Sequence, residues 1–326
     1  MISKLLVIHQ GAIGDLLLAS PAIWSLYTHF RPKEFYIAGH PWATEIFKGI
    51  YEVSGIYNVD VPPFSRLWSG EFRVEFELAV VFSEYRGWVE LLRKAGTKEV
   101  WLLPPFPKER VHLLYHHCMS LQGMGISAKM GMPSLFLTKI EIEWAKAYLE
   151  ALGITGPFLA VHPSASSPKK VWPVERMAYT AHELSLRHGL QVVLVQGPID
   201  ERACCDFLKS FPGKCHVFKE LSLRQLGALL YHSSLFIGND SGVAHLAAAS
   251  GTKVLVIFGP TDPVLWTPLG RWVKWIWGRA PCSPCGLEER RKCEDLLCLK
   301  EVKPERVAEL AEEMLYKLQS ESGRKG

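Results

Sequence analysis

The 326-residue sequence lacks the features that would place it in several large protein classes. It has no run of 18 uncharged apolar residues, so no membrane-spanning helix is predicted. The net charge of +4 is too small an excess to indicate a nucleic-acid-binding surface. The glycine fingerprints of dinucleotide-binding and phosphate-loop proteins, G-x-G-x-x-G and G-x-x-x-x-G-K-[ST], are absent, and so is a metal-binding D-x-D motif.

What the sequence does contain is typical of a globular protein with two domains. Hydrophobic residues make up 48% of the chain, and its length exceeds what one core usually accommodates. The first apolar stretch is short, predicts a strand and precedes no small-residue cleavage site, so we expect a cytoplasmic protein. The whole net positive charge lies in residues 151–326, which favours that half for an anionic ligand.

Apolar runs alternate with helical patterns along both halves, which predicts an α/β fold with parallel, doubly wound sheets. The expected strands are residues 4–9, 34–38, 55–59, 77–82, 98–103, 158–161, 191–196, 216–218, 234–237 and 253–258. The expected helices are residues 15–30, 42–49, 85–95, 109–123, 141–152, 174–188, 200–210, 222–232, 242–249 and 304–319. We place one domain at 1–153, a second at 154–303, and a last helix, 304–326, that packs back on the first domain.

The most informative segment, residues 238–249, combines a strand end, a polar turn and a helix start. Ser241 and Gly242 open the helix, where unpaired N–H groups and the helix dipole favour a phosphate. Asp240 and His245 add hydrogen-bonding groups for a ligand larger than phosphate. A well-capped turn with Asp or Ser as the N-cap explains the same residues, so this motif alone leaves both interpretations open.

A second motif, Gly11, Ala12, Ile13, Gly14 and Asp15, follows the first predicted strand. The two glycines permit a tight turn with close approach of the backbone to a ligand. Asp15 stands at a helix start, where the dipole keeps a carboxylate ionised, and such a carboxylate can act as a general base. An N-cap aspartate is the commoner explanation of an isolated Asp at this position.

The third motif, residues 162–173, lies between a predicted strand and a predicted helix. Its hydroxyl residues, among them Ser164 and Ser166, precede Lys170, and short donors with a point charge suit a diphosphate. The pair Lys169 and Lys170 would, on its own, be typical of a solvated surface. All three motifs follow strands, and sites in parallel sheets lie at the carboxyl ends of strands, so we expect the motifs to converge.

Together the motifs resemble those of the bacterial lipopolysaccharide heptosyltransferases, glycosyltransferase family 9. The matching pieces are residues 11–15, His162-Pro163 with Lys170-Val171-Trp172-Pro173, residues 240–245 and Phe258-Gly259-Pro260-Thr261-Asp262-Pro263. Their order and separation match over nearly the whole chain. The resemblance implies the GT-B architecture, in which a Rossmann-like acceptor-side domain and a Rossmann-like nucleotide-sugar-binding domain face a cleft.

The resemblance also implies a chemistry. An inverting, metal-independent transferase without a cofactor would move L-glycero-D-manno-heptose from ADP-heptose to a hydroxyl of the lipopolysaccharide inner core. Asp15 matches the family's catalytic aspartate and would take the proton of that hydroxyl. Lys170, Ser164 and the helix start at Ser241 and Gly242 would stabilise the leaving diphosphate. A lipid-linked acceptor implies peripheral contact with the inner face of the inner membrane.

Further residues are candidates for the rest of the ligands. Asp240 and His245 would contact the donor's sugar and phosphates, and Leu221 stands where the family lines the adenine pocket. Asp200 and Glu201 follow a strand end and can hold ribose hydroxyls, although acids at a helix N-terminus need no ligand to explain them. Basic residues that either meet an anionic acceptor or simply lie on the surface are Arg66, Arg73, Arg86, Arg93 and Lys94.

Four of the eight cysteines, Cys282, Cys285, Cys293 and Cys298, form a C-x2-C-x7-C-x4-C cluster. Four thiolates can hold a structural zinc ion, but the spacing between these pairs is shorter than in common zinc ribbons. Disulfides and free thiols are the alternatives, and none of the three makes the cluster catalytic.

Other functions fit parts of the pattern. A related glycosyltransferase would use another nucleotide sugar, and a nucleotide-binding module would use the same phosphate motifs without catalysis. A sugar-nucleotide epimerase shares the GT-B fold but needs acid/base residues on both faces of the sugar, and Asp15 alone argues against it. The sequence leaves open the acceptor and linkage, the donor sugar, the state of the cysteine cluster and the oligomeric state.

Overall fold

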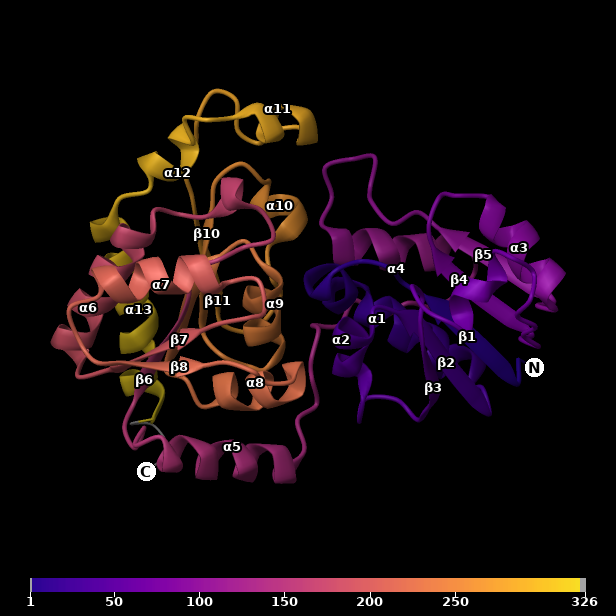
Figure 1. Cartoon of the computed structure of the whole chain (residues 1–326), viewed down its shortest axis with the longest axis horizontal. Helices are drawn as coiled ribbons and strands as arrows, with labels where there is room; N and C mark the ends of the chain where they lie inside the picture. Colours follow the sequence, from indigo (N-terminus) through magenta and orange to yellow (C-terminus); the bar gives the residue numbers. More distant parts are fainter. Residues whose placement is uncertain (1, 323–326) are drawn as a thin grey trace. The chain divides into compact units, whose positions relative to one another are not determined.

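The computed structural model describes residues 2–322 and divides into two compact units, Met1–Phe136 and Leu137–Gly326. Each unit is a parallel sheet flanked by helices, so the predicted α/β class with two doubly wound sheets is confirmed (Figure 1). Residues 323–326 of the predicted last helix lie outside the described residues. Among the residues described, no helix is long and apolar enough to cross a membrane.

The first unit is built on a five-stranded sheet in the order β3-β2-β1-β4-β5. Its strands are β1 (Lys4–Ile8), β2 (Glu34–Gly39), β3 (Val53–Asn58), β4 (Leu78–Phe82) and β5 (Glu99–Leu103). Its helices are α1 (Ile13–Phe30), α2 (Pro41–Thr44), α3 (Gly87–Ala95) and α4 (Leu113–Gly123). All strand pairs are parallel, and the strand order reverses between β1 and β4.

The second unit is built on a six-stranded parallel sheet in the order β11-β10-β9-β6-β7-β8, which reverses between β6 and β9. Its strands are β6 (Phe158–His162), β7 (Gln191–Val195), β8 (Cys215–Phe218), β9 (Leu235–Asn239), β10 (Val254–Phe258) and β11 (Val273–Trp277). Its helices are α5 (Lys139–Ala151), α6 (Val174–His188), α7 (Glu201–Ser210), α8 (Leu223–Tyr231), α9 (Gly242–Ala249), α10 (Pro263–Trp266), α11 (Leu287–Lys292), α12 (Leu297–Glu301) and α13 (Pro304–Ser322).

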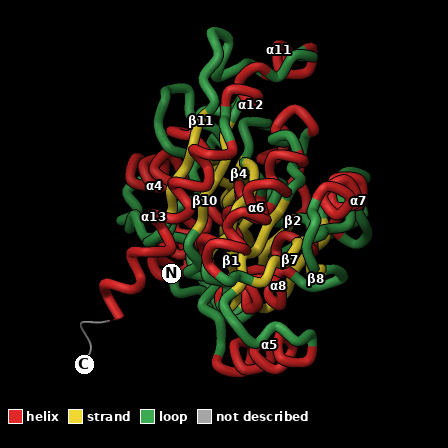
Figure 2. Tube along the Cα trace, turned by 90° about the vertical axis from the view of Figure 1, so that its left-hand side faces the viewer, coloured by secondary structure: helices red, strands yellow, loops and turns green. Residues whose placement is uncertain are grey.

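The central strands are continuous apolar runs because helices cover both faces of each sheet. Every residue of β6, β9 and β10 is buried, and Figure 2 shows the strands in yellow surrounded by helices and loops. Trp172, in the loop after β6, is the largest fully buried side chain, and its indole N–H donates to the carbonyl of Val302 at 3.1 Å. This contact fixes the far end of the loop that carries the lysine motif.

Several features differ from the prediction. Helix α5, placed in the first domain by the sequence, belongs to the second unit because it packs beside α8 (Figures 1 and 2). Helix α13 packs against α6 of the second unit, where the sequence predicts packing on the first domain. The predicted helix 42–49 is only α2 followed by one 3-10 turn, because Gly49 adopts a φ of +83° and turns the chain away.

Candidate active site

The motifs at residues 162–173 and 238–249 meet where the strand order of the second unit reverses. The loop after β6 carries Lys170, and the turn from β9 into α9 carries Asp240 and Ser241. Because β6 and β9 are adjacent parallel strands, both turns emerge at the same edge of the sheet. Open parallel sheets bind their ligands at such reversal points, outside the carboxyl ends of the strands.

Lys170 and Asp240 form an ion pair at this edge. The ammonium nitrogen of Lys170 donates to Oδ2 of Asp240 at 2.8 Å, and the hydroxyl of Thr261, from the loop after β10, donates to the same oxygen at 2.8 Å. The Lys170 side chain is 17% exposed and that of Asp240 7%, so the pair is partly desolvated yet remains reachable. The sequence analysis included Thr261 only as part of a motif. Its hydrogen bond to Asp240 could not be predicted, because it depends on β9 and β10 being adjacent in the sheet.

Asn239 fixes the loop that presents Lys170. This fully buried residue ends β9; its Oδ1 accepts the backbone N–H of Trp172 at 2.9 Å, and its Nδ2 donates to the carbonyl of Ser164 at 3.3 Å. One side chain thus bonds both ends of the loop between β6 and α6. Nothing in the sequence except its place beside Asp240 pointed to this function.

His162, the last residue of β6, connects two of the predicted donor residues. Its Nε2 lies 3.0 Å from Oδ2 of Asp200 and its Nδ1 lies 3.2 Å from Oγ of Ser241, and all three side chains are buried. The backbone N–H of Gly197 donates to the same Asp200 oxygen at 2.7 Å. Burial opposes ionisation of Asp200, but hydrogen bonds from His162, Ser164 and Gly197 lower its pKa to about 2.

This arrangement changes the interpretation of the acidic candidates. Asp200 points into the site wall toward His162, while its neighbour Glu201 is exposed at the first turn of α7 and remains the accessible candidate for ribose hydroxyls. Ser164 is buried, Ser166 is exposed on the same loop, and His245 is buried in the first turns of α9.

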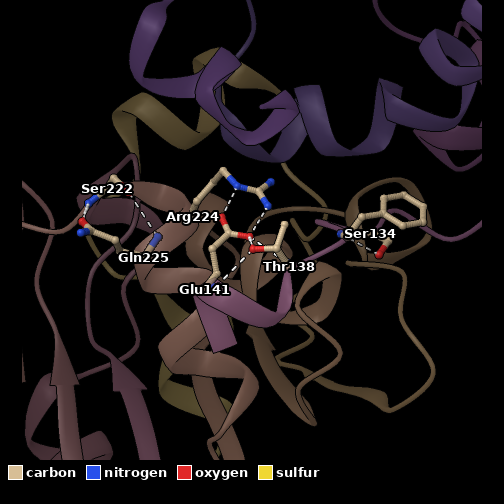
Figure 3. A network of polar contacts seen from close by, with 7 residues as sticks. Ser134, Thr138, Glu141, Ser222, Arg224 and Gln225 are labelled. Atoms are coloured by element: carbon tan, nitrogen blue, oxygen red, sulfur yellow. Dashed lines mark hydrogen bonds and ion pairs between the residues drawn. The ribbon is translucent and has the colours of Figure 1, made fainter. Parts of the chain in front are cut away.

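The proposed adenine-side segment begins α8. Leu221 is half-buried, and the next residue, Ser222, caps the helix by accepting the N–H of Gln225 at 3.2 Å. Figure 3 shows Arg224 of the same turn reaching toward Glu141 of α5. Its Nε and Nη2 donate to the two carboxylate oxygens at 2.6 and 2.8 Å.

Thr138 completes the network around Glu141, since its N–H and hydroxyl both donate to that carboxylate at 2.8 Å (Figure 3). Partial burial opposes ionisation, but these bonds together with Arg224 lower the pKa of Glu141 to about 2. The first residues of the second unit are thereby attached to the turn that carries Leu221.

In the first unit, the 11–15 motif forms the turn from β1 into α1, at the strand-order reversal of that sheet. Helix α1 begins at Ile13, two residues earlier than predicted, and Oδ2 of Asp15 accepts the N–H of Ala12 at 3.1 Å. A side chain at Gly11 would lie 2.6 Å from the ring of His9 and 2.8 Å from Cβ of Asp15. Glycine at position 11 is therefore required to keep Asp15 in place.

His9 stabilises this turn through a hydrogen bond. It is almost completely buried, and its Nδ1 accepts the N–H of Gly11 at 3.2 Å. Burial lowers the pKa of His9 to about 4, so the ring is neutral at pH 7. The sequence identified His9 only as the end of a strand, because its burial depends on Phe82 of β4, whose ring centroid lies 5.0 Å away.

Three of the five candidate basic residues line one open concavity on the first unit. Arg86, Arg93 and Lys94 surround a volume of about 750 Å³ together with Glu90 of α3. Arg73 instead donates to the carbonyl of Lys94 at 3.1 Å, and Arg66 lies in a 3-10 turn.

The cysteine cluster gains no support as a zinc site. All eight cysteines are free thiols, and no group of three or more metal-binding side chains is arranged around one position within residues 2–322. Two of the thiols are neighbours, and burial together with the nearby Cys282 raises the pKa of Cys285 to about 11.

Comparisons with known proteins point to one family. The family model described as glycosyltransferase family 9 (heptosyltransferase) matches residues 108–294. Lipopolysaccharide heptosyltransferase 3 of Escherichia coli (strain K12) is 35% identical over 176 residues, so the chain spans about half the length of this relative. Lipooligosaccharide heptosyltransferase 2 of Campylobacter jejuni is 23% identical over 317 residues, which are 93% of this chain and 95% of that protein.

Solved structures share the fold. The glycosyl transferase family 9 protein of Veillonella parvula matches with a TM-score of 0.80 at 16% identity, over 97% of this chain and 98% of that chain. The E. coli ADP-heptose lps heptosyltransferase II matches with a TM-score of 0.74 at 18% identity, over 97% and 99%. The E. coli heptosyltransferase WaaC with ADP-2-deoxy-2-fluoro heptose matches with a TM-score of 0.67 at 16% identity, over 95% and 99%.

Proposed function

The chain belongs to glycosyltransferase family 9, and on this basis we propose that it transfers L-glycero-D-manno-heptose from ADP-heptose to a hydroxyl of the lipopolysaccharide inner core. The observation that carries the proposal is the Lys170–Asp240 pair beside the first turn of α9, at the strand-order reversal of the second unit. A cation, hydroxyls and helix N–H groups converge there, which is the donor set that a leaving diphosphate requires.

The donor's diphosphate binds, in this proposal, between the loop after β6 and the start of α9. Lys170 exchanges part of its contact with Asp240 for a phosphate oxygen, while Asp240 retains the hydroxyl of Thr261. Gly242 and Val243 at the start of α9 are partly exposed, so their N–H groups are available to the ligand. The adenine side of the donor extends toward Leu221, and its ribose toward Glu201.

Asp15 acts as the general base. Its carboxylate is oriented by the N–H of Ala12 and sits in the first turn of α1, where the helix dipole favours the ionised form. It accepts the proton of the acceptor hydroxyl as that oxygen attacks the anomeric carbon opposite the departing ADP. Inversion of the anomeric configuration follows from this single displacement, and the products are ADP and the extended saccharide.

The acceptor is a lipid-linked core saccharide in this proposal, which would bring the enzyme to a membrane surface. Its phosphate and carboxylate groups would meet the concavity lined by Arg86, Arg93 and Lys94.

Product analysis tests the proposed function. The purified chain is incubated with ADP-heptose and a deacylated Kdo-containing acceptor, with ADP-glucose and UDP-heptose as matched donor controls. We expect release of ADP, a heptosylated product from ADP-heptose only, and inverted anomeric configuration by NMR. Transfer from ADP-glucose or UDP-heptose in preference would overturn the donor assignment, and retention of configuration would overturn the role of Asp15.

A further inference from the structure

His162 connects Ser241, at the start of α9, with Asp200, before α7, and neither helix capping nor apolar packing requires this connection. Ser241 occupies the N-cap position of α9, but its hydroxyl makes no capping bond to the helix and is instead 3.2 Å from Nδ1 of His162. On the other side of the ring, Nε2 meets Asp200 at 3.0 Å. The exposed fractions of His162, Asp200 and Ser241 are 3%, 5% and 7%, so water competes little for these bonds.

The chemistry of the three groups fixes the position of one hydrogen, whereas the position of a second depends on whether the imidazole is neutral or protonated. Asp200 is held ionised by its hydrogen bonds and is therefore an acceptor only, so Nε2 of His162 carries a hydrogen. When the ring is neutral, Nδ1 has a lone pair and must accept the hydrogen of the Ser241 hydroxyl. When the ring is protonated, Nδ1 donates to Oγ of Ser241, and the hydroxyl hydrogen is released for another acceptor.

The inference rests on the proposed function, since it needs a diphosphate at the start of α9. We propose that His162 is a positioning residue that takes up one proton when the diphosphate binds and thereby turns the Ser241 hydroxyl into a donor to a phosphate oxygen. Asp200 holds the ring and balances the charge of the imidazolium. The proton comes from solvent, and it returns to solvent when ADP leaves.

Other ionisable groups lie on the elements that carry Ser241 and Asp200, or pair with those elements, and the test must separate them from His162. They are the Lys170–Asp240 pair next to Ser241, His245 one turn along α9, and the thiol of Cys204 on α7. Burial, followed by the charge of Asp200, raises the pKa of Cys204 to about 12, so this thiol does not titrate near neutral pH. His245 is therefore the competing imidazole.

The dissociation constant of ADP between pH 7 and 9, measured by calorimetry at constant ionic strength, tests the proposal. In this range the terminal phosphate of ADP is mostly ionised, because the second pKa of a phosphate monoester lies near 6. Uptake of one proton makes the Kd of the wild type rise with pH, by at most about tenfold per pH unit. His162→Asn and His162→Gln should abolish this dependence. His245→Gln should retain it, and so should His182→Gln on helix α6, a histidine outside the donor site that serves as the matched control.

The two substitutions at His162 separate positioning from folding. An asparagine amide overlaps Nδ1 and keeps a partner for Ser241, whereas a glutamine amide overlaps Nε2 and keeps a partner for Asp200. We expect His162→Asn to bind ADP more tightly than His162→Gln at pH 8, with Ser241→Ala about fivefold weaker than wild type. A wild-type Kd independent of pH, or a pH dependence lost in His245→Gln and kept in both His162 variants, would overturn this inference alone. Failure of the wild type to bind ADP at any pH would overturn both it and the proposed donor.

Discussion

The ammonium group of Lys170 lies 2.8 Å from the carboxylate of Asp240, which joins the loop after β6 to the turn after β9 across the reversal of strand order. The pair holds the lysine in place before any ligand arrives. A preorganised cation loses little side-chain entropy on binding, so more of its attraction for a phosphate contributes to affinity.

Replacing Lys170 by methionine should therefore weaken ADP binding about tenfold to a hundredfold, because a hydrogen bond to a charged group contributes about 1.5–3 kcal/mol. The adjacent Lys169, whose ammonium donates to the carbonyl of Cys293, provides the matched control. Lys169→Met should change the Kd by less than about threefold in calorimetry. Since Lys170→Met also removes the ion-pair partner of Asp240, the double variant with Asp240→Asn checks that a folding defect does not cause the loss. Equal effects at positions 169 and 170 would refute the assignment of the phosphate contact to Lys170.

Asn239→Ala should disorder the loop between β6 and α6 without touching the ligand. The variant removes the partners of the Trp172 N–H and the Ser164 carbonyl, so we expect about 2–3 kcal/mol less free energy of unfolding in urea. ADP affinity should fall as well, because Lys170 lies on this loop. Unchanged ADP affinity in a destabilised variant would show that the loop keeps its form without Asn239.

The strands, and the loops with motifs that follow their carboxyl ends, were predictable from the sequence, since buried parallel strands are continuous apolar runs and the motifs follow them directly. The functions of Asn239, Thr261 and His162 were not, because each depends on which strand lies next to which. Two adjacent turns follow β6 and β9, yet these strands are separated by more than 70 residues of sequence. The position of α5 was misjudged for the same reason, since its contact with α8 is a tertiary one and the Gly and Pro residues after it resemble a linker.

The ion pair between Arg224 and Glu141 should contribute measurably to stability, because the Arg224 side chain is only 9% exposed and binds both carboxylate oxygens. A double-mutant cycle with Arg224→Met and Glu141→Gln should give a coupling energy of about 1–3 kcal/mol in urea unfolding. The pair Arg306–Glu309 on α13, with both side chains more than half exposed, is the control and should couple by less than about 0.5 kcal/mol. Equal coupling energies in the two pairs would show that burial does not strengthen the ion pair between Arg224 and Glu141.

Two buried histidines should make the first unit sensitive to mild acid. Burial lowers the pKa of His9 to about 4, and burial with the neighbouring histidines lowers that of His117 to about 3. In the unfolded chain both histidines have ordinary pKa values near 6.5. Between that pH and the lowered pKa values the unfolded chain binds more protons than the folded chain. The free energy of unfolding is therefore highest above pH 6.5 and decreases as the pH falls. From pH 6.5 to 5 each site should remove about 2 kcal/mol from the free energy of unfolding.

His117→Leu tests this dependence, because neither ring nitrogen of His117 has a hydrogen-bond partner among the described residues. The substitution should leave stability at pH 7 unchanged or higher and should roughly halve the loss between pH 6.5 and 5 in urea titrations. A loss of stability at pH 7, with the acid sensitivity intact, would mean that the His117 ring makes a stabilising polar contact in the folded protein.

The role of Asp15 as the general base is tested most directly by single-turnover heptose transfer with Asp15→Asn, with ADP affinity measured on the same preparation. Asparagine keeps the size of the side chain and an oxygen for the N–H of Ala12, but it cannot accept the acceptor's proton. We expect a rate at least about a hundredfold below wild type, because the general base is lost, with ADP affinity within about twofold. A variant that transfers heptose at the wild-type rate would show that Asp15 is not the base.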